Sequence, residues 1–126
     1  MLSFSGRTKI YAATKPVDLR KHFDSLYAYC RDVLEEDPLS GHAFLFINRA
    51  RNRIKCLYWD GSGLILICKR LEKYRFTRLN RLLGETIEMT SSEFSLFLEG
   101  ANLSKRFVES PQKLIFSLSK RMEKRC

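Results

Sequence analysis

The chain has 126 residues, a length that suits one domain rather than two. Hydrophobic residues make up 44% of the sequence and aromatic residues 12%, a composition that excludes an intrinsically disordered chain. The formal net charge of +9 is concentrated in residues 42–83, which contain ten Lys/Arg against two Asp/Glu. Positive charge that is concentrated in one segment favours an anionic partner. Lys and Arg at sheet edges also serve to block aggregation.

The first elements predicted along the chain are a short strand and a long helix. Residues 9–14 have the composition of a strand, and Asp18, which follows Pro16, is placed to cap a helix over residues 19–35. Apolar residues recur at helical spacing along one face of this helix, which we expect to pack on the rest of the protein. They are Leu19, Phe23, Leu26, Tyr27, Cys30, Val33 and Leu34.

Three strands are predicted next, at residues 42–48, 53–59 and 63–69. The links between them are short, and the second contains the Asp60-Gly61 signal of a tight turn, so we expect an antiparallel meander. Because the first and third strands are apolar on both faces, the helix cannot be the only layer that covers the sheet.

Residues 70–84 are ambiguous, because basic and apolar side chains alternate there without a clear period. Residues 85–89 are typical of a short strand. Thr90 and Glu93 form a capping-box pattern that begins a short helix, which Gly100 can end. A further helix is predicted after Ser110-Pro111, with Leu114, Ile115, Leu118 and Met122 on one face.

Together these elements predict an α+β fold. Its antiparallel sheet is built on the three-strand meander, with the long N-terminal amphipathic helix packed on it and short helices at the C-terminal end. We expect one domain over residues 1–104, followed by a basic amphipathic helix or tail over residues 105–126.

Motifs of catalysis and metal binding are not found in the sequence. Asp18, Asp24 and Asp60 are the carboxylates that could hold two metal ions, but each has a simpler local role. The four cysteines lack close CxxC spacing. We therefore expect no catalytic residue, no metal, no cofactor and no small-molecule substrate. With no signal peptide and no apolar run of about 18 residues, we expect a cytoplasmic protein that does not enter membranes.

Basic side chains predict a DNA-binding patch within residues 49–81. The stretch "NRARNRIK" (48–55) has a basic residue at every second position, at the junction of two predicted strands. An antiparallel meander brings the start of its second strand and the end of its third to the same edge, so two basic clusters would merge there. Their members are Arg49, Arg51, Arg53, Lys55, Lys69, Arg70, Lys73, Arg75, Arg78 and Arg81. Such a patch would bind phosphates with weak sequence preference. Tyr74 and Phe76, which lie among these cations, are weaker candidates for stacking on bases.

Three segments carry a family resemblance: "PVDLRKHFDSL" (16–26), "EDPLSGHAFLFINRARNRIKCLYWDGSGLILICKRLE" (36–72) and "RF" (75–76), with the ending "TSSEFSLFLEGAN" (90–102). Over residues 7–102 the chain resembles the small accessory protein, often called TnpB, encoded by the second reading frame of IS66-type bacterial insertion sequences. The resemblance implies a role in transposition, beside a transposase and other accessory proteins of the element, and it supplies no catalytic residues, so we expect a non-catalytic accessory protein. Two functions stay open: DNA binding through the basic patch, and docking on the transposase without contact to DNA.

Overall fold

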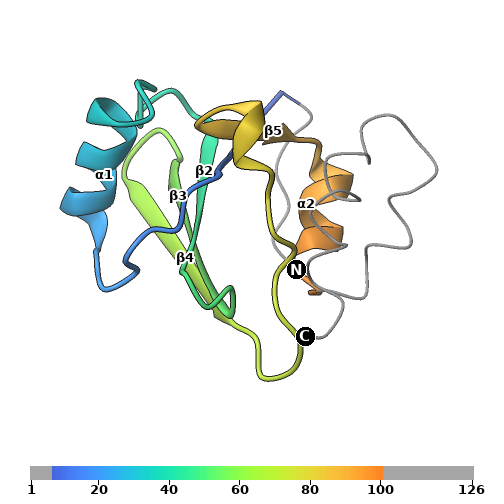
Figure 1. Ribbon diagram of the computed structural model, residues 1–126. Coiled ribbons are helices and arrows are strands. Elements are labelled where there is room, and N and C mark those ends of the chain that lie inside the picture. Colours follow the sequence, from blue (N-terminus) through green and yellow to red (C-terminus); the bar gives the residue numbers. More distant parts are fainter. Residues whose placement is uncertain (1–6, 101–126) are drawn as a thin grey trace.

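The computed structural model describes residues 7–100, so the C-terminal helix and tail predicted over residues 105–126 lie outside the described part (Figure 1). One five-stranded sheet has the strand order β4-β3-β2-β1-β5. Its strands are β1 (Ile10–Ala13), β2 (Ala43–Ile47), β3 (Arg53–Trp59), β4 (Leu64–Arg70) and β5 (Thr86–Met89). The helices are α1 (Phe23–Asp32), α2 (Ser91–Phe97) and a single 3-10 turn, η1 (Arg81–Leu83).

The sheet is mixed. β2, β3 and β4 pair antiparallel in chain order, and β5 pairs antiparallel with β1. β1 and β2 are parallel, because the chain returns to the start of the sheet through α1 before β2 begins. The carboxyl ends of β1 and β2 therefore lie at the same end of the sheet.

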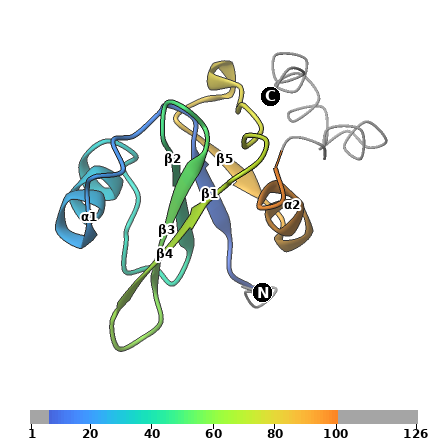
Figure 2. The same ribbon diagram turned by 90° about the horizontal axis from the view of Figure 1, so that it is seen from below.

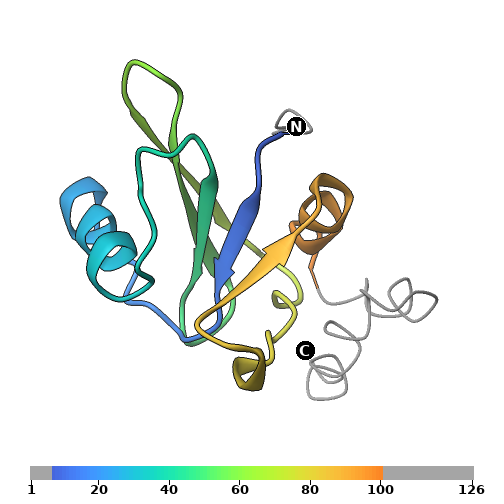
Figure 3. The same ribbon diagram turned by 90° about the horizontal axis from the view of Figure 1, so that it is seen from above.

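The two helices cover opposite faces of the sheet, as Figures 2 and 3 show from below and above. On the α1 face, Leu26 and Cys30 pack with Phe44 and Phe46 of β2. The alternate β2 residues Ala43, Leu45 and Ile47 face α2, where they pack with Phe94 and Phe97 among others. Strands that are apolar on both faces thus receive the two covering layers that they require.

The predicted fold class is wrong in its arrangement. The three meander strands are present, but they form part of a five-stranded mixed sheet that includes a parallel pair. The expected long N-terminal helix is the short α1, which begins at Phe23 rather than at residue 19. Asp18 does not cap it: its carboxylate accepts hydrogen bonds from the backbone and side chain of Arg20, and His22 occupies the N-cap position.

The predicted apolar stripe of this helix is wrong at two positions. Phe23 and Val33 are each 43% exposed, whereas Leu26 and Cys30 are fully buried against the sheet. Leu26 and Cys30, which are four residues apart, lie on the face of this ten-residue helix that contacts the sheet. The side chains at its two ends project past the sheet.

The second helix follows the sequence signal. Thr90 accepts a hydrogen bond from the Glu93 N–H at 3.1 Å, and the Glu93 carboxylate accepts one from the Thr90 N–H at 2.9 Å. This capping box satisfies two backbone donors at the start of α2. The helix then presents Phe94 and Phe97 to the second core.

Candidate nucleic-acid interface

The β4–β5 connection, residues 71–85, brings distant basic residues together. β4 and β5 are the two outer strands of the sheet, so their connection has to cross the ends of the strands between them. It is fastened to the β2–β3 turn by two backbone hydrogen bonds, from Leu71 N to Asn52 O at 2.8 Å and from Phe76 N to Arg51 O at 2.7 Å. Phe76 and Leu79 anchor the connection in the core. Lys73, Arg75 and Arg78, which lie between Leu71 and Leu79, are thereby held beside the turn.

The β2–β3 turn is itself well fixed. The Asn48 side-chain oxygen accepts hydrogen bonds from the N–H groups of Asn52 (3.0 Å) and Arg53 (3.1 Å). Arg51 has φ of +58°, a left-handed conformation that is uncommon for a non-glycine residue. The rigid turn sets the direction of Arg49, which is exposed at its tip.

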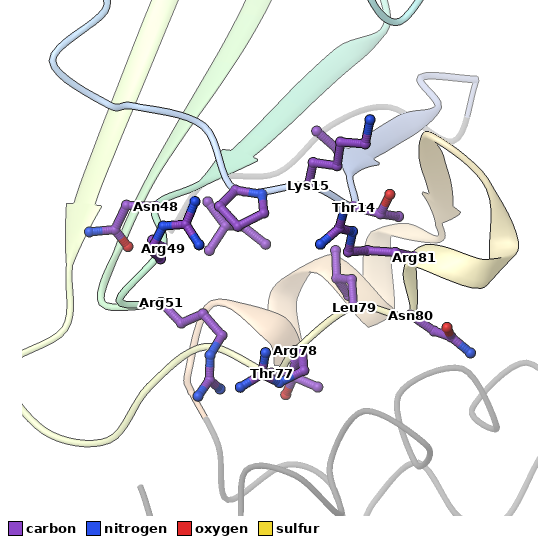
Figure 4. A pocket seen from close by; sticks show the side chains of 13 residues that line it. Thr14, Lys15, Asn48, Arg49, Arg51, Thr77, Arg78, Leu79, Asn80 and Arg81 are labelled. Carbon is purple, nitrogen blue, oxygen red and sulfur yellow. The ribbon is translucent and has the colours of Figure 1, made fainter.

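A cavity of about 340 Å³ opens where this turn, the end of β1 and the crossing connection meet (Figure 4). We call it the cationic pocket. Its basic lining residues are Lys15, Arg49, Arg51, Arg78 and Arg81, and no Asp or Glu lines it. The other lining residues are Ala13, Thr14, Pro16, Ile47, Asn48, Thr77, Leu79 and Asn80. Five cations around an apolar and hydroxyl-bearing floor favour an anionic ligand that also has apolar surface.

Three cations of the pocket are unpaired within residues 7–100: Arg49, Arg78 and Arg81 form no ion pair there. In Figure 4, Arg49 and Arg81 reach into the opening from opposite sides, and Lys15 points away from it. Lys15 lies 3.6 Å from the Glu85 carboxylate, but both side chains are half exposed, so this pair is worth little. The pocket therefore keeps most of its positive charge.

Two more open hollows, of about 480 and 550 Å³, continue the positive surface away from the pocket. The first is lined by Arg20, Arg49 and Arg53 together with Asp18. The second is lined by Arg20, Arg53, Lys55, Lys69, Arg70 and Glu72. Arg53 lies directly opposite Arg70 on paired strands, an unfavourable arrangement of like charges, and the Glu72 carboxylate lies 2.9 Å from Arg70. We call the cationic pocket and the two hollows together the cationic edge.

Four predicted binding residues have internal roles. Lys55 is only 8% exposed, and its ammonium donates to the Lys21 carbonyl at 2.6 Å and lies 3.3 Å from His22 Nδ1. Lys69 donates to the Leu98 carbonyl at 2.7 Å, beyond the end of α2. Two others bond to carbonyl groups across the turn: Arg51 to Phe76 (3.2 Å) and Arg75 to Ala50 (2.6 Å).

The other predicted cations are exposed. Arg70 pairs with Glu72 at 2.9 Å. Lys73 is exposed in the connection that follows β4. The structure therefore brings the predicted residues together along one edge, and Arg49, Arg53, Lys73, Arg78 and Arg81 are exposed there without an ion pair within residues 7–100.

The residues considered for base stacking and for metal binding have structural roles instead. Phe76 is fully buried and stacks on Phe97, with ring centroids 5.3 Å apart, so it cannot stack on a base. Asp60 accepts hydrogen bonds from the N–H groups of Ser62 and Gly63, which lower its pKa and fix the β3–β4 turn. Asp18 and Asp60 lie near opposite ends of β3, too far apart to share metal ions.

The buried cysteines are poor nucleophiles. Desolvation raises the pKa of Cys30 and of Cys56 to about 12, so both thiols stay protonated at neutral pH. Cys56 faces the α2 core, whereas Cys68 is opposite Lys55 and is exposed. Within residues 7–100 no group of three His, Cys, Asp or Glu side chains could hold a metal ion.

Sequence reasoning missed three residues of the cationic edge: Lys15, Arg20 and Thr77. Lys15 follows β1 at the carboxyl end of the parallel pair, where open sheets commonly bind ligands. That position could have been recognised only from the pairing of β1 with β2. Thr77 had no sequence signal, since a lone threonine in a basic loop is unremarkable.

One family model matches most of the chain. Residues 8–107 match the family described as "IS66 Orf2 like protein". Two relatives come from Sinorhizobium fredii (strain NBRC 101917 / NGR234) and are described as "Uncharacterized protein y4jC" and "Uncharacterized protein y4hO". The first is 34% identical over 90% of this chain and 99% of its own length, and the second is 32% identical over 79% and 86%. No solved structure matches significantly.

No helix within residues 7–100 is long and apolar enough to cross a membrane. The match extends from before β1 to beyond α2, so it includes every strand and helix described above. The turn and the crossing connection that form the cationic edge also lie within it. The chain belongs to the IS66 Orf2-like family, and this membership indicates an accessory protein of an insertion sequence.

Proposed function

We propose that the protein is a non-catalytic accessory factor of transposition that binds DNA through the cationic edge. The observation that carries this proposal is the cluster of exposed arginines without an ion pair in residues 7–100, namely Arg49, Arg53, Arg78 and Arg81. Guanidinium groups that are hydrated and unpaired lose little when they meet phosphates, and they release the counterions of the DNA.

The mechanism is positioning rather than chemistry. Arginines from the β2–β3 turn and from the crossing connection are fixed on one rigid edge, so they would contact successive backbone phosphates. Phosphate contacts set orientation but carry no sequence information. The protein would therefore place itself, and any partner in the transposition machinery, on DNA of any sequence.

Salt titration tests DNA binding directly. If the four exposed arginines each neutralise one phosphate, the log–log plot of duplex affinity against salt should have a slope of about −3.6. Terminal inverted repeats of the element and unrelated duplexes should bind alike in an electrophoretic shift assay. Absence of binding at about 50 mM salt, or a slope near zero, would refute the proposal.

A second assay tests the non-catalytic role. Purified protein with Mg²⁺ or Mn²⁺ should neither nick nor join DNA that carries insertion-sequence ends, because Asp18 is engaged in an ion pair and Asp60 in a turn, near opposite ends of β3. Supercoiled plasmid converted to open circles, with the activity lost in Asp60→Asn, would show that the protein is a nuclease after all.

A second candidate function is docking on the transposase without contact to DNA. The outer edge of β4 favours it, since that edge pairs with no strand of residues 7–100 and Ile65 is 37% exposed beside it. An open strand edge can accept a strand from another protein. Adding the cognate transposase to the shift assay separates the two functions: docking alone predicts binding only when the transposase is present.

A further inference from the structure

The cationic pocket differs from the rest of the cationic edge in shape and in chemistry. The two hollows beside it are larger, at about 480 and 550 Å³, but more open, whereas the pocket of about 340 Å³ is more enclosed. Its apolar floor includes Ala13, Ile47 and Leu79, none of which lines either hollow. Phosphates of a duplex need only outward-pointing cations. An apolar floor below those cations would add nothing to the binding of a duplex, because the bases of a duplex are stacked and paired.

A buried hydroxyl points to a ligand with polar groups of its own. Thr77 lines the pocket and is 1% exposed, yet its hydroxyl forms no hydrogen bond within residues 7–100. Thr14, which also lines the pocket, donates its hydroxyl hydrogen to the Gly84 carbonyl at 2.6 Å and keeps an acceptor lone pair. Buried polar groups are normally hydrogen-bonded, so the unused capacity of Thr77 is informative.

The geometry points to an unpaired nucleotide of DNA as the ligand of the cationic pocket. This inference rests on the proposed function, because the same protein surface carries both. A nucleotide that has left the duplex presents a flat apolar base with polar edges, attached to a phosphate. The apolar floor and the guanidinium planes would hold the base, and Thr77 would contact its edge. Arg49 and Arg81, which reach in from opposite sides, would hold the phosphate.

This assignment gives the cationic edge a preference that phosphate contacts alone cannot give. Duplex DNA would lie across the edge, and an unpaired end or an opened base pair would place one nucleotide in the pocket. The chemical class that we assign is therefore DNA with a locally unpaired strand.

The test uses the full-length protein and two substrates that differ only at one end. One is a blunt duplex, and the other is the same duplex with a short single-stranded extension. Wild-type protein should bind the extended duplex at least about fivefold more tightly at equal salt, as expected from one stacked base. Because an extension also adds phosphates, a third substrate carries an abasic extension of equal length. It should bind like the blunt duplex apart from the small contribution of its added charge.

Two double variants locate the preference. Arg78→Ala with Arg81→Ala removes two cations that line only the pocket, and Arg53→Ala with Arg70→Ala removes two that lie outside it. Both pairs are exposed, so both should weaken blunt-duplex binding, the outside pair less because Arg70 is paired with Glu72. Only the pocket pair should abolish the preference for the extension.

The outcomes separate this inference from the function on which it rests. Equal affinity for blunt and extended duplexes, or a preference that survives in the pocket pair, would overturn the pocket assignment while duplex binding stands. Failure of the wild-type protein to bind any of the three substrates would overturn both. Loss of the preference in the pocket pair alone would support the assignment.

Discussion

Phe76→Ala should lower the free energy of unfolding by about 3–5 kcal/mol, the range for removing a large aromatic side chain from a core. Phe76 is fully buried and stacks on Phe97 of α2. Its N–H also donates to the Arg51 carbonyl, so a cavity here loosens both the α2 core and the crossing connection. Urea denaturation followed by circular dichroism would measure the loss.

Phe23→Ala is the matched control for this change. It removes the same atoms from a side chain that is 43% exposed at the start of α1, so the cost should be below about 1 kcal/mol. Equal losses for the two variants would contradict the packing described here. Since the α1 stripe by itself predicts a buried Phe23, the pair also decides between helical periodicity and tertiary placement.

Arg49→Ala combined with Arg53→Ala should weaken duplex binding roughly 60-fold at about 0.1 M salt. Both arginines are exposed on the cationic edge, and neither forms an ion pair within the described chain. Two lost phosphate contacts reduce the log–log salt slope by about 1.8, and affinities that converge near about 1 M salt then differ by this factor at about 0.1 M. Shift assays across a salt series would give both quantities.

The control variant is Lys9→Ala with Arg31→Ala, which removes the same charge at positions outside the cationic edge. It should leave the slope unchanged. If the control variant weakens binding as much as the edge variant, the attraction depends on net charge and not on a defined surface. Arg51 is unsuitable for this experiment, because its side chain donates to the Phe76 carbonyl and its removal would disturb the fold.

Local features of this fold are predictable from sequence, because their partners lie within a few residues. The Thr90–Glu93 capping box and the Asp60-Gly61 turn are examples, and both occur as expected. The parallel pairing of β1 with β2 is different. Nothing within residues 9–14 indicates which strand lies beside them, so an antiparallel sheet was the simpler expectation, and it was wrong.

The candidate site shows the same division. The alternating arginines and the basic connection are visible in the sequence, and the merging of the two clusters follows from antiparallel pairing of β3 with β4. The sequence does not reveal which cations bond to carbonyl groups inside the protein. Lys55 lies two residues after Arg53 on the same strand and on the same face, yet it is covered by the segment before α1 and donates to the Lys21 carbonyl. The pocket could not be predicted without knowing where β1 ends in the sheet.

The place of β1 in the sheet has a consequence for how the protein is made. Within residues 7–100, β1 is the first strand to be synthesised, but Ile10 pairs on one side with Ala43 and on the other with Met89. During translation it has to wait for β5, the last strand of that range, and contacts between such distant segments form slowly. Until then one edge of β1 stays open in the growing chain, where it can pair with a wrong strand or a neighbouring molecule.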